Sequence, residues 1–384
     1  MKNSFTGRKK SQICCIFVAK TRKHVTIYHI MIDRFAGCDG RLQRRCFRGG
    51  TLRGVLSKLD YIQSLGCSGI LLTPFYKTNE YHGYHVLDYE QVDPHFGTWD
   101  DVSVLVDETH RRGMTIAADI VANHCHKDNI LVKTHPDWFK HDNDGNLKCY
   151  YGIDFLPEFD FSNYEARNYM IKIGKKLCHI GFDALRIDYA KGLPLNFLRQ
   201  FSRALHHDAP CVKLIGEVWG KPDGKRLPST LSHAVKSGEM SLQDAWQKRY
   251  AGILDGVMDF ESQFLIVKTV RAGQNITNNV QLAAALHLHF SHYADVPNYQ
   301  LWKFLDNHDT NRFLYECGDD MQQLRRALDI LNQQPYPTLL YYGTERGMTN
   351  RVDVFGSTPY ADEHARQCMR WNAPLCPSFN TEKN

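Results

Sequence analysis

The chain has 384 residues, of which 43% are hydrophobic and 12% aromatic, so it can bury one large core and shows no disordered bias. Its formal net charge is only +5, and its basic residues are scattered except near the start, which argues against a nucleic-acid partner. No apolar stretch is long enough to span a bilayer, so we expect no membrane association.

Residues 1–24 are predicted to form an N-terminal arm. The apolar run at residues 13–19 is short for a signal peptide, and Lys20 and Arg22 stand where a small-residue cleavage site should be. The twelve cysteines are irregularly spaced, with no C-x-x-C pair, which argues against a zinc ribbon and a disulfide scaffold. We therefore expect free thiols and a cytoplasmic protein.

Segments of strand character alternate with segments of helical character from Val25 onward. Compact apolar runs predict eight strands, at residues 26–32, 68–73, 114–121, 182–187, 211–215, 256–260, 301–305 and 338–342. Helical periodicity is found at residues 52–65, 99–112, 164–180, 196–206, 263–271, 281–288 and 321–331. Strands separated by helices pair in parallel. The sequence therefore predicts an α/β fold, a (β/α)8 barrel formed by residues 25–121 and 162–345.

Two stretches depart from this alternation. Residues 122–161 are rich in Asp, Asn, His and aromatic side chains, and a loop of that length is usually functional, so we expect a small inserted subdomain there. Residues 346–384 are predicted to form a C-terminal tail without a strong amphipathic helix. The eighth helix of the barrel is therefore not found, and an uncovered strand would expose apolar surface.

Four predicted strands end in carboxylates: Asp119, Asp188, Glu217 and Asp309. The carboxyl ends of barrel strands meet at one rim, so we expect these acids to lie close together. Arg186 precedes Asp188 by two residues and points to the same side, where it would keep Asp188 ionised. Crowded carboxylates supply a protonated acid beside an ionised one, as glycosidases require. The alternative is an Arg–Asp pair that only braces the barrel.

Together, these residues resemble the α-amylase family of retaining glycoside hydrolases, glycoside hydrolase family 13, over about residues 28–371. The four strand ends match in order. Other matching stretches are Ile27-Tyr28-His29, Asp33-Arg34-Phe35, Tyr81-His82-Gly83-Tyr84, Asp88-Tyr89, Asp93 through Phe96-Gly97-Thr98, and Leu156-Pro157-Glu158-Phe159-Asp160. The C-terminal β-sandwich of the family is not recognisable in this chain.

The resemblance implies three catalytic residues. Asp188 would be the nucleophile that forms a covalent glycosyl-enzyme, with Arg186 holding its orientation and charge. Glu217 would protonate the leaving oxygen and then activate water. Asp309 would bind the sugar's hydroxyls as the ring flattens.

The resemblance also implies a set of substrate-binding residues: His82, Tyr84, His124, Arg186, Lys191, Trp219 and His308. The histidines would hydrogen-bond the sugar and Tyr84 would stack under its ring. Packing alone is the alternative for His82 and Tyr84. Trp219 is either a platform for the acceptor side of the substrate or a core residue.

Calcium is a candidate cofactor on the same grounds. Asn123 matches a ligand position of the family, and an Asp of the inserted subdomain could complete the site. However, the Lys-His pair that usually follows the nucleophile is Lys191-Gly192 here, and a Gly-Gly-Asp associated with a second calcium site is Gly49-Gly50-Thr51.

The resemblance therefore predicts hydrolysis of α-1,4-glucosidic bonds in starch, glycogen or maltooligosaccharides. A 4-α-glucanotransferase acting on the same substrates is one alternative, because a sugar hydroxyl can replace water. A non-catalytic protein with this fold is another, although the chain keeps the acids and has no membrane anchor.

Overall fold

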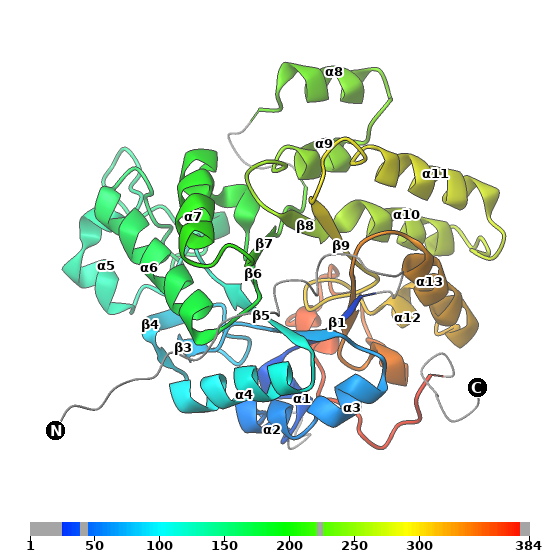
Figure 1. The fold of residues 1–384 in the computed structure, drawn as a ribbon, viewed down its shortest axis with the longest axis horizontal. Coiled ribbons are helices and arrows are strands. Elements are labelled where there is room, and N and C mark those ends of the chain that lie inside the picture. The colour runs from blue at the N-terminus through cyan, green and yellow to red at the C-terminus, as the bar shows by residue number, and fades with distance from the viewer. Residues whose placement is uncertain (1–24, 39–44, 221–225, 377–384) are drawn as a thin grey trace.

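The computed structural model describes residues 25–38, 45–220 and 226–376. Eight parallel strands close into a barrel in the order β1-β10-β9-β8-β7-β6-β5-β2 (Figure 1). They are β1 (Thr26–Ile30), β2 (Gly69–Leu72), β5 (Thr115–Ile120), β6 (Ala184–Ile187), β7 (Lys213–Gly216), β8 (Gly256–Asp259), β9 (Gln300–Phe304) and β10 (Thr338–Tyr341). The predicted barrel is confirmed. The strand predictions miss the observed ends by at most two residues.

Helices surround the barrel (Figure 1). The described α-helices are α1 (Ile32–Phe35), α2 (Leu52–Leu56), α3 (Leu59–Ser64), α4 (Trp99–Arg111), α5 (Ile130–Thr134), α6 (Tyr164–Ile180), α7 (Leu195–Asp208), α8 (Ser229–Lys236), α9 (Leu242–Lys248), α10 (Phe260–Arg271), α11 (Val280–Ser291), α12 (Phe313–Glu316) and α13 (Met321–Gln333). The helix predicted at residues 52–65 is divided between α2 and α3 at Lys58, whose φ of −113° and ψ of 7° lie outside the helical region. Within the described ranges, none of the helices is long and apolar enough to cross a membrane.

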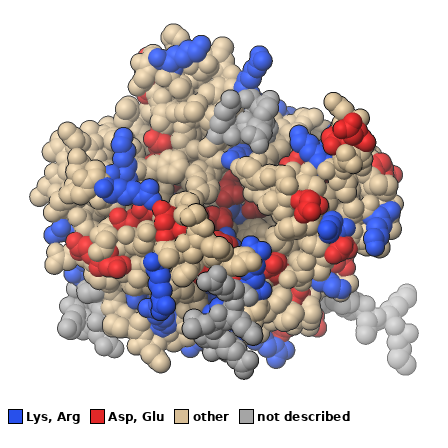
Figure 2. All heavy atoms as spheres, turned by 180° about the vertical axis from the view of Figure 1, so that it is seen from behind, with Lys and Arg blue, Asp and Glu red and all other residues tan. Residues whose placement is uncertain are grey.

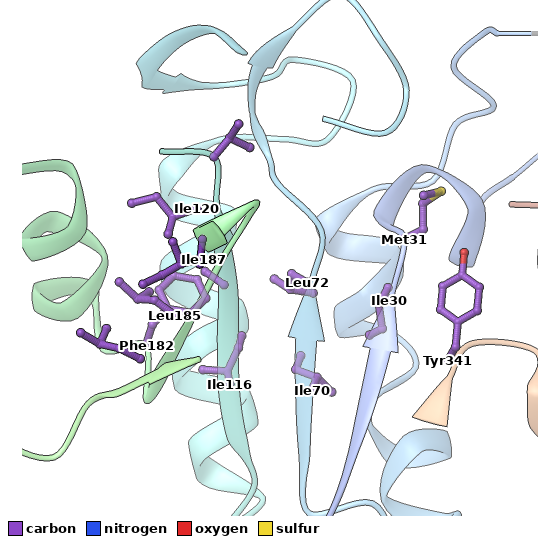
Figure 3. Packing of buried hydrophobic residues seen from close by; sticks show 14 of the residues in the cluster. Ile30, Met31, Ile70, Leu72, Ile116, Ile120, Phe182, Leu185, Ile187 and Tyr341 are labelled. Atoms are coloured by element: carbon purple, nitrogen blue, oxygen red, sulfur yellow. The ribbon is translucent and has the colours of Figure 1, made fainter. Parts of the chain in front are cut away.

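The period-2 alternation of each strand separates two buried layers. One layer packs between the strands and the helices, and Figure 3 shows part of it, with Ile70 and Leu72 of β2 beside Ile116 and Ile120 of β5. The other layer fills the barrel with Ile27, Leu71, Ala117, Ala184, Ile215, Met258, Phe260, Trp302, Phe304 and Leu339. Two residues further along their strands, the inward positions are polar: His29, Asp119, Arg186 and Glu217. The alternation that fills the barrel thus places functional groups at its mouth.

The loop between β2 and α4 contains a hairpin that the sequence analysis did not predict. It pairs β3 (Tyr76–Thr78) with β4 (Val86–Val92) antiparallel, and its turn carries His82 and Tyr84. Between β5 and α6, the predicted inserted segment holds α5, two 3-10 turns and isolated β-bridges. The boundaries of the predicted subdomains stay predictions, and the N-terminal arm lies outside the described residues.

The chain after β10 packs against the barrel without an α-helix as far as residue 376, where the description ends. It contains the 3-10 turns Thr344–Arg346 and Ala361–His364. The Trp371 ring contacts Phe35 and Tyr61 edge-on, at centroid distances of 5.1 and 5.2 Å. Residues of the predicted tail therefore cover the outside of α1 and α3. They do so without forming an eighth α-helix of the barrel within the described residues.

The prediction of free thiols is wrong for three described cysteines, one of which is the disulfide-bonded Cys211. Cys38, after α1, forms a disulfide with Cys368, which lies 330 residues further along the chain. Irregular spacing could not reveal this, because only the folded barrel brings the last described segment beside the first helix. Six other described cysteines are free thiols: Cys67, Cys125, Cys149, Cys178, Cys317 and Cys376. The cytoplasmic location stays a prediction.

Candidate active site

Arg186 joins three of the four predicted strand-end acids. Its Nη1 lies 2.6 Å from Asp119 Oδ2 and 2.9 Å from Asp188 Oδ1. Its Nη2 lies 2.8 Å from Glu217 Oε1. The guanidinium is fully buried, and both Asp188 and Glu217 are 8% exposed. Because one planar group touches Asp188 and Glu217, these two carboxylates lie side by side at the barrel mouth, on neighbouring strands β6 and β7.

The electrostatics of this cluster differ from the prediction that Arg186 alone keeps Asp188 ionised. Burial raises the pKa of Asp188 well above its ordinary value, and the charges of Glu217 and Asp119 add to the effect of burial. Arg186 opposes this shift but is shared among three acids. Burial likewise raises the pKa of Asp119 to about 6, against the pull of Arg186. One positive charge does not balance three carboxylates, so the cluster favours retaining a proton.

The backbone fixes Glu217 at the end of β7. Its amide donates to the Ile187 carbonyl at 3.0 Å, and its carbonyl accepts from the Lys191 amide at 3.3 Å. Its Oε2 accepts a hydrogen bond from the Tyr189 amide at 2.9 Å. The carboxyl group is thus held at both oxygens, by the strand-end turn on one side and by Arg186 on the other.

Asp309 is held ionised by a separate pair of groups. Its Oδ2 lies 2.9 Å from His308 Nε2, and its Oδ1 accepts from Arg366 Nη2 at 3.0 Å. Burial disfavours the charged form, but the charge and hydrogen bond of His308 and the charge of Arg366 outweigh burial and lower the pKa of Asp309. Asp309 is therefore an ionised acceptor beside the Arg186 cluster.

These acids open into a cavity of about 530 Å³. Its lining includes Asp188, Glu217 and Asp309, and also the predicted binding residues His82, Tyr84, His124, Lys191, Trp219 and His308. The face seen in Figure 2 is hollowed near its centre, and acidic side chains lie in the hollow. Apart from Arg186, which lies beneath the acids, every residue predicted to act on substrate lines the one cavity.

The tyrosine and histidine side chains of the cavity offer both hydrogen-bonding groups and flat ring surfaces. The Tyr84 ring lies parallel to His308 at 5.0 Å, and its hydroxyl donates to Asp119. The His124 ring stacks on Tyr150 at 4.5 Å. Burial lowers the pKa of His124 to about 4 and that of His82 well below its ordinary value. Both histidines are therefore neutral at pH 7, when each imidazole has one donor and one acceptor nitrogen.

Lys191 and Trp219 are connected to each other. The Lys191 ammonium donates to the Trp219 carbonyl oxygen, and the Trp219 ring stacks on Phe260 at 5.2 Å. Trp219 thus packs against the barrel core and also lines the cavity, and its role as a platform for the acceptor side of the substrate stays a prediction. A β-carbon on Gly192 would lie 2.3 Å from the Tyr189 ring, which explains why no larger residue follows Lys191.

Arg366 and Asp362 were missed by the sequence analysis, although both line the cavity. Arg366 Nη1 contacts Asp362 at 2.7 Å, and Arg366 Nε donates to the His308 carbonyl at 2.7 Å. The only sequence signal for this ion pair is that Arg366 follows Asp362 by four residues. That spacing could not show that a segment assigned to the tail returns to the barrel mouth. Tyr150 and Tyr151 of the inserted segment, also in the lining, were noted only as aromatic residues.

The groups around Asn123 do not fit a calcium ion as they stand. The Asn123 side-chain amide donates to Glu158 Oε1 at 3.3 Å, while Glu158 Oε2 accepts from Lys140 Nζ at 2.9 Å. The nearby carboxylate is thus already paired with an ammonium. Among the described residues, no group of three His, Cys, Asp or Glu side chains is placed to hold a metal. Calcium stays a prediction, and no step of the chemistry below depends on it.

Comparison with known proteins places this geometry in a family. The family model described as "Alpha amylase, catalytic domain" matches residues 29–148 and 133–383. Alpha-amylase 2 of Dictyoglomus thermophilum is 30% identical over 363 residues, which are 90% of this chain and 59% of that protein. Neopullulanase 2 of Thermoactinomyces vulgaris is 27% identical, over 90% of this chain and 60% of its own length. The chain thus spans about three-fifths of these curated relatives.

Solved structures agree with the sequence matches. The α-amylase of Geobacillus thermoleovorans, crystallised with acarbose, superposes with a TM-score of 0.73 at 28% identity, covering 94% of this chain and 77% of that one. An Anoxybacillus α-amylase gives a TM-score of 0.75 at 25% identity, covering 93% and 76%. The family model covers most of the chain, and three of the four strand-end acids, Asp188, Glu217 and Asp309, line one cavity. The chain belongs to the α-amylase catalytic-domain family.

Proposed function

We propose that this chain is a retaining glycoside hydrolase that cleaves α-1,4-glucosidic bonds in starch, glycogen or maltooligosaccharides. The observation that carries the proposal is the shared contact of Arg186 with Asp188 and Glu217 at the wall of one cavity. A guanidinium is narrow, so the two carboxyl groups can flank a single glycosidic oxygen. Relatives named α-amylase and neopullulanase support the substrate class.

In the proposed reaction, a carboxylate oxygen of Asp188 attacks the anomeric carbon as the bond from that carbon to the leaving oxygen breaks. Glu217 gives its proton to the leaving oxygen. Water then enters, loses a proton to Glu217 and attacks the anomeric carbon, which releases the sugar and regenerates Asp188. Two displacements on one carbon retain its configuration.

The charges around the site suit this sequence of steps. The reaction needs one proton on Glu217 and none on Asp188. Burial favours the protonated form of Asp188, and the ion pair with Arg186 opposes that effect. As the glycosidic oxygen leaves, positive charge develops on the sugar ring. Ionised Asp309 stands beside that ring and stabilises its charge.

The cavity also suits a chain of sugar rings. Its volume of about 530 Å³ lies in the range of sites that hold several rings of a ligand. Tyr84, Tyr150, Tyr151 and Trp219 offer flat apolar faces, which match the apolar faces of glucose. Tyr151 is 63% exposed at the end of the inserted segment, so it can contact a sugar that extends out of the cavity.

The proposal is tested with maltoheptaose as substrate. The purified chain should release reducing ends and yield only shorter oligomers by chromatography. Longer oligomers appearing together with shorter ones would assign the glucanotransferase alternative. Absence of any product from maltoheptaose, starch and glycogen, with a folded protein, would contradict the proposal in favour of a non-catalytic role.

Arg366 is predicted to support activity by helping His308 to hold Asp309 ionised. Replacing Arg366 with methionine removes a charged hydrogen bond to Asp309, so kcat/KM should fall about 10–100-fold. Because Arg366 helps to lower the pKa of Asp309, its loss raises that pKa, and the ratio of parent to variant kcat/KM should grow as the pH falls. The measurement is kcat/KM on maltoheptaose from acidic to neutral pH.

Arg370 provides the matched control, because it is exposed in the same segment. Arg370→Met should leave the profile unchanged. A ratio of parent to Arg366→Met kcat/KM that stays constant with pH would show that Arg366 does not act through Asp309.

A further inference from the structure

We infer that the ammonium of Lys140 takes the place of a metal cation in this chain. It pairs with Glu158, which in turn contacts Asn123, the residue that the family resemblance implies as a calcium ligand. In this account Lys140 supplies one fixed positive charge, and the segment is held to the barrel without a bound ion.

The contacts form a short chain across the junction. Lys140 Nζ donates to Glu158 Oε2 at 2.9 Å, and Asn123 Nδ2 donates to Glu158 Oε1 at 3.3 Å. The Lys140 and Glu158 side chains are 26% and 12% exposed, and Asn123 is buried. Water therefore screens this ion pair less than an exposed one. The carboxylate of Glu158 has a donor on each oxygen, which is the arrangement that buried charge requires.

Backbone contacts bring the same residues into register. The Lys140 amide donates to the Glu158 carbonyl at 2.9 Å, and the Phe159 amide donates to the Asn123 carbonyl at 3.0 Å. His124 and Glu158 form an antiparallel bridge. The strand-like stretch around Glu158 is thus fixed between Lys140 on one side and the loop after β5 on the other. The ammonium is built into this pairing, since its own backbone takes part in it.

The donor set disfavours a divalent ion in the same place. Calcium takes six to eight oxygen ligands, usually with several carboxylates among them. At this junction the acid in contact with Asn123 is Glu158, and the ammonium beside it would repel a second cation. Asn123 also turns its N–H group, rather than its oxygen, toward the carboxylate. Neither the charges nor the orientation of the amide suit a calcium ion.

The junction is coupled to the active site on two sides. His124, next to Asn123, lines the cavity and stacks on Tyr150. The Asn123 side-chain oxygen lies 2.8 Å from the point that a β-carbon on Gly192 would occupy, so Asn123 contacts the turn that follows Asp188. Lys140 is therefore a positioning residue for this wall of the cavity, although it does not reach the reacting atoms.

The first test is thermal unfolding of the parent protein, monitored by circular dichroism. Its Tm should be the same in excess EDTA and in millimolar CaCl2, because no metal is part of the fold. Calorimetric titration with CaCl2 should show no saturable binding. A Tm that falls in EDTA and recovers with CaCl2, or a stoichiometric binding isotherm, would overturn the inference.

The second test uses variants of the lysine. Lys140→Met leaves Glu158 without its cation and should lower Tm by about 3–5 °C. Lys140→Arg should keep most of the parent's Tm because it restores the charge. Lys148→Met, at an exposed lysine of the same segment, should leave Tm unchanged. Limited proteolysis adds a local readout, since Lys140→Met should be cleaved faster within residues 122–161.

These readouts do not depend on the proposed reaction. If Lys140→Met does not fold, the EDTA and calorimetric experiments on the parent still decide the question. A Lys140→Met protein with the parent's Tm and proteolysis pattern would contradict the role of the ammonium, whatever the enzyme does to maltoheptaose.

Discussion

Replacing Asp188 with asparagine is expected to lower kcat on maltoheptaose by about 10⁴-fold or more, because the amide cannot form the covalent glycosyl-enzyme. Asparagine keeps the size of the side chain and can still meet Arg186, so the fold should persist. The measurement is the rate of reducing-end release, with enzyme concentration raised until residual activity is detected.

The matched control is Asp107→Asn, an exposed acid of α4, which should retain the parent's rate. Circular dichroism of both variants checks that the barrel is intact. If Asp188→Asn keeps activity within a few-fold of the parent, Asp188 is not the nucleophile, and another acid of the Arg186 cluster must be considered.

Replacing Glu217 with glutamine is expected to have an effect that depends on the leaving group. With maltoheptaose, kcat/KM should fall about 10²–10⁴-fold, because the leaving sugar oxygen no longer receives a proton. With α-maltosyl fluoride, kcat/KM should fall much less, because fluoride departs without full protonation. The measurement is the ratio of kcat/KM on the two substrates for parent and variant.

Glu239→Gln is the matched control, at an exposed acid outside the cavity, and should leave both values unchanged. An equal loss on both substrates would show that Glu217 does not act as the proton donor. It would then be a residue that only orients the substrate or the Arg186 guanidinium.

Much of this site could be predicted from the sequence, because in a barrel the spacing of residues along each strand fixes where their side chains lie. Side chains two apart on a strand share a face, so Arg186 and Asp188 had to point together. The carboxyl ends of parallel strands meet at one rim, so Asp188 and Glu217 had to be neighbours once the alternation was recognised. Apolar strands and amphipathic helices carry this signal strongly, and the strand ends were found within two residues.

What could not be predicted depends on contacts between segments that are distant in the chain. Arg366 reaches Asp309 from a segment without regular secondary structure, and nothing in its own sequence shows where that segment runs. The Cys38–Cys368 disulfide is hidden for the same reason. The Lys140–Glu158 pair also depends on how an irregular segment folds back.

The sharing of Arg186 among three acids is a further limit of sequence reasoning. Strand spacing predicts that Arg186 meets Asp188, but it does not show that Asp119 and Glu217 meet the same guanidinium. Burial, to which the charges of Glu217 and Asp119 add, raises the pKa of Asp188 against the expected direction. Strand spacing shows neither the depth of burial nor the neighbouring charges.

The covalent intermediate provides the most direct test of the account. In Glu217→Gln, α-maltosyl fluoride can still form the glycosyl-enzyme, but no base activates water to remove it, so the intermediate should accumulate. Mass spectrometry of the digested protein should find one maltosyl group on the peptide that contains Asp188. A maltosyl group on another acid, or an unmodified Asp188 peptide while the parent hydrolyses the same fluoride, would contradict the account.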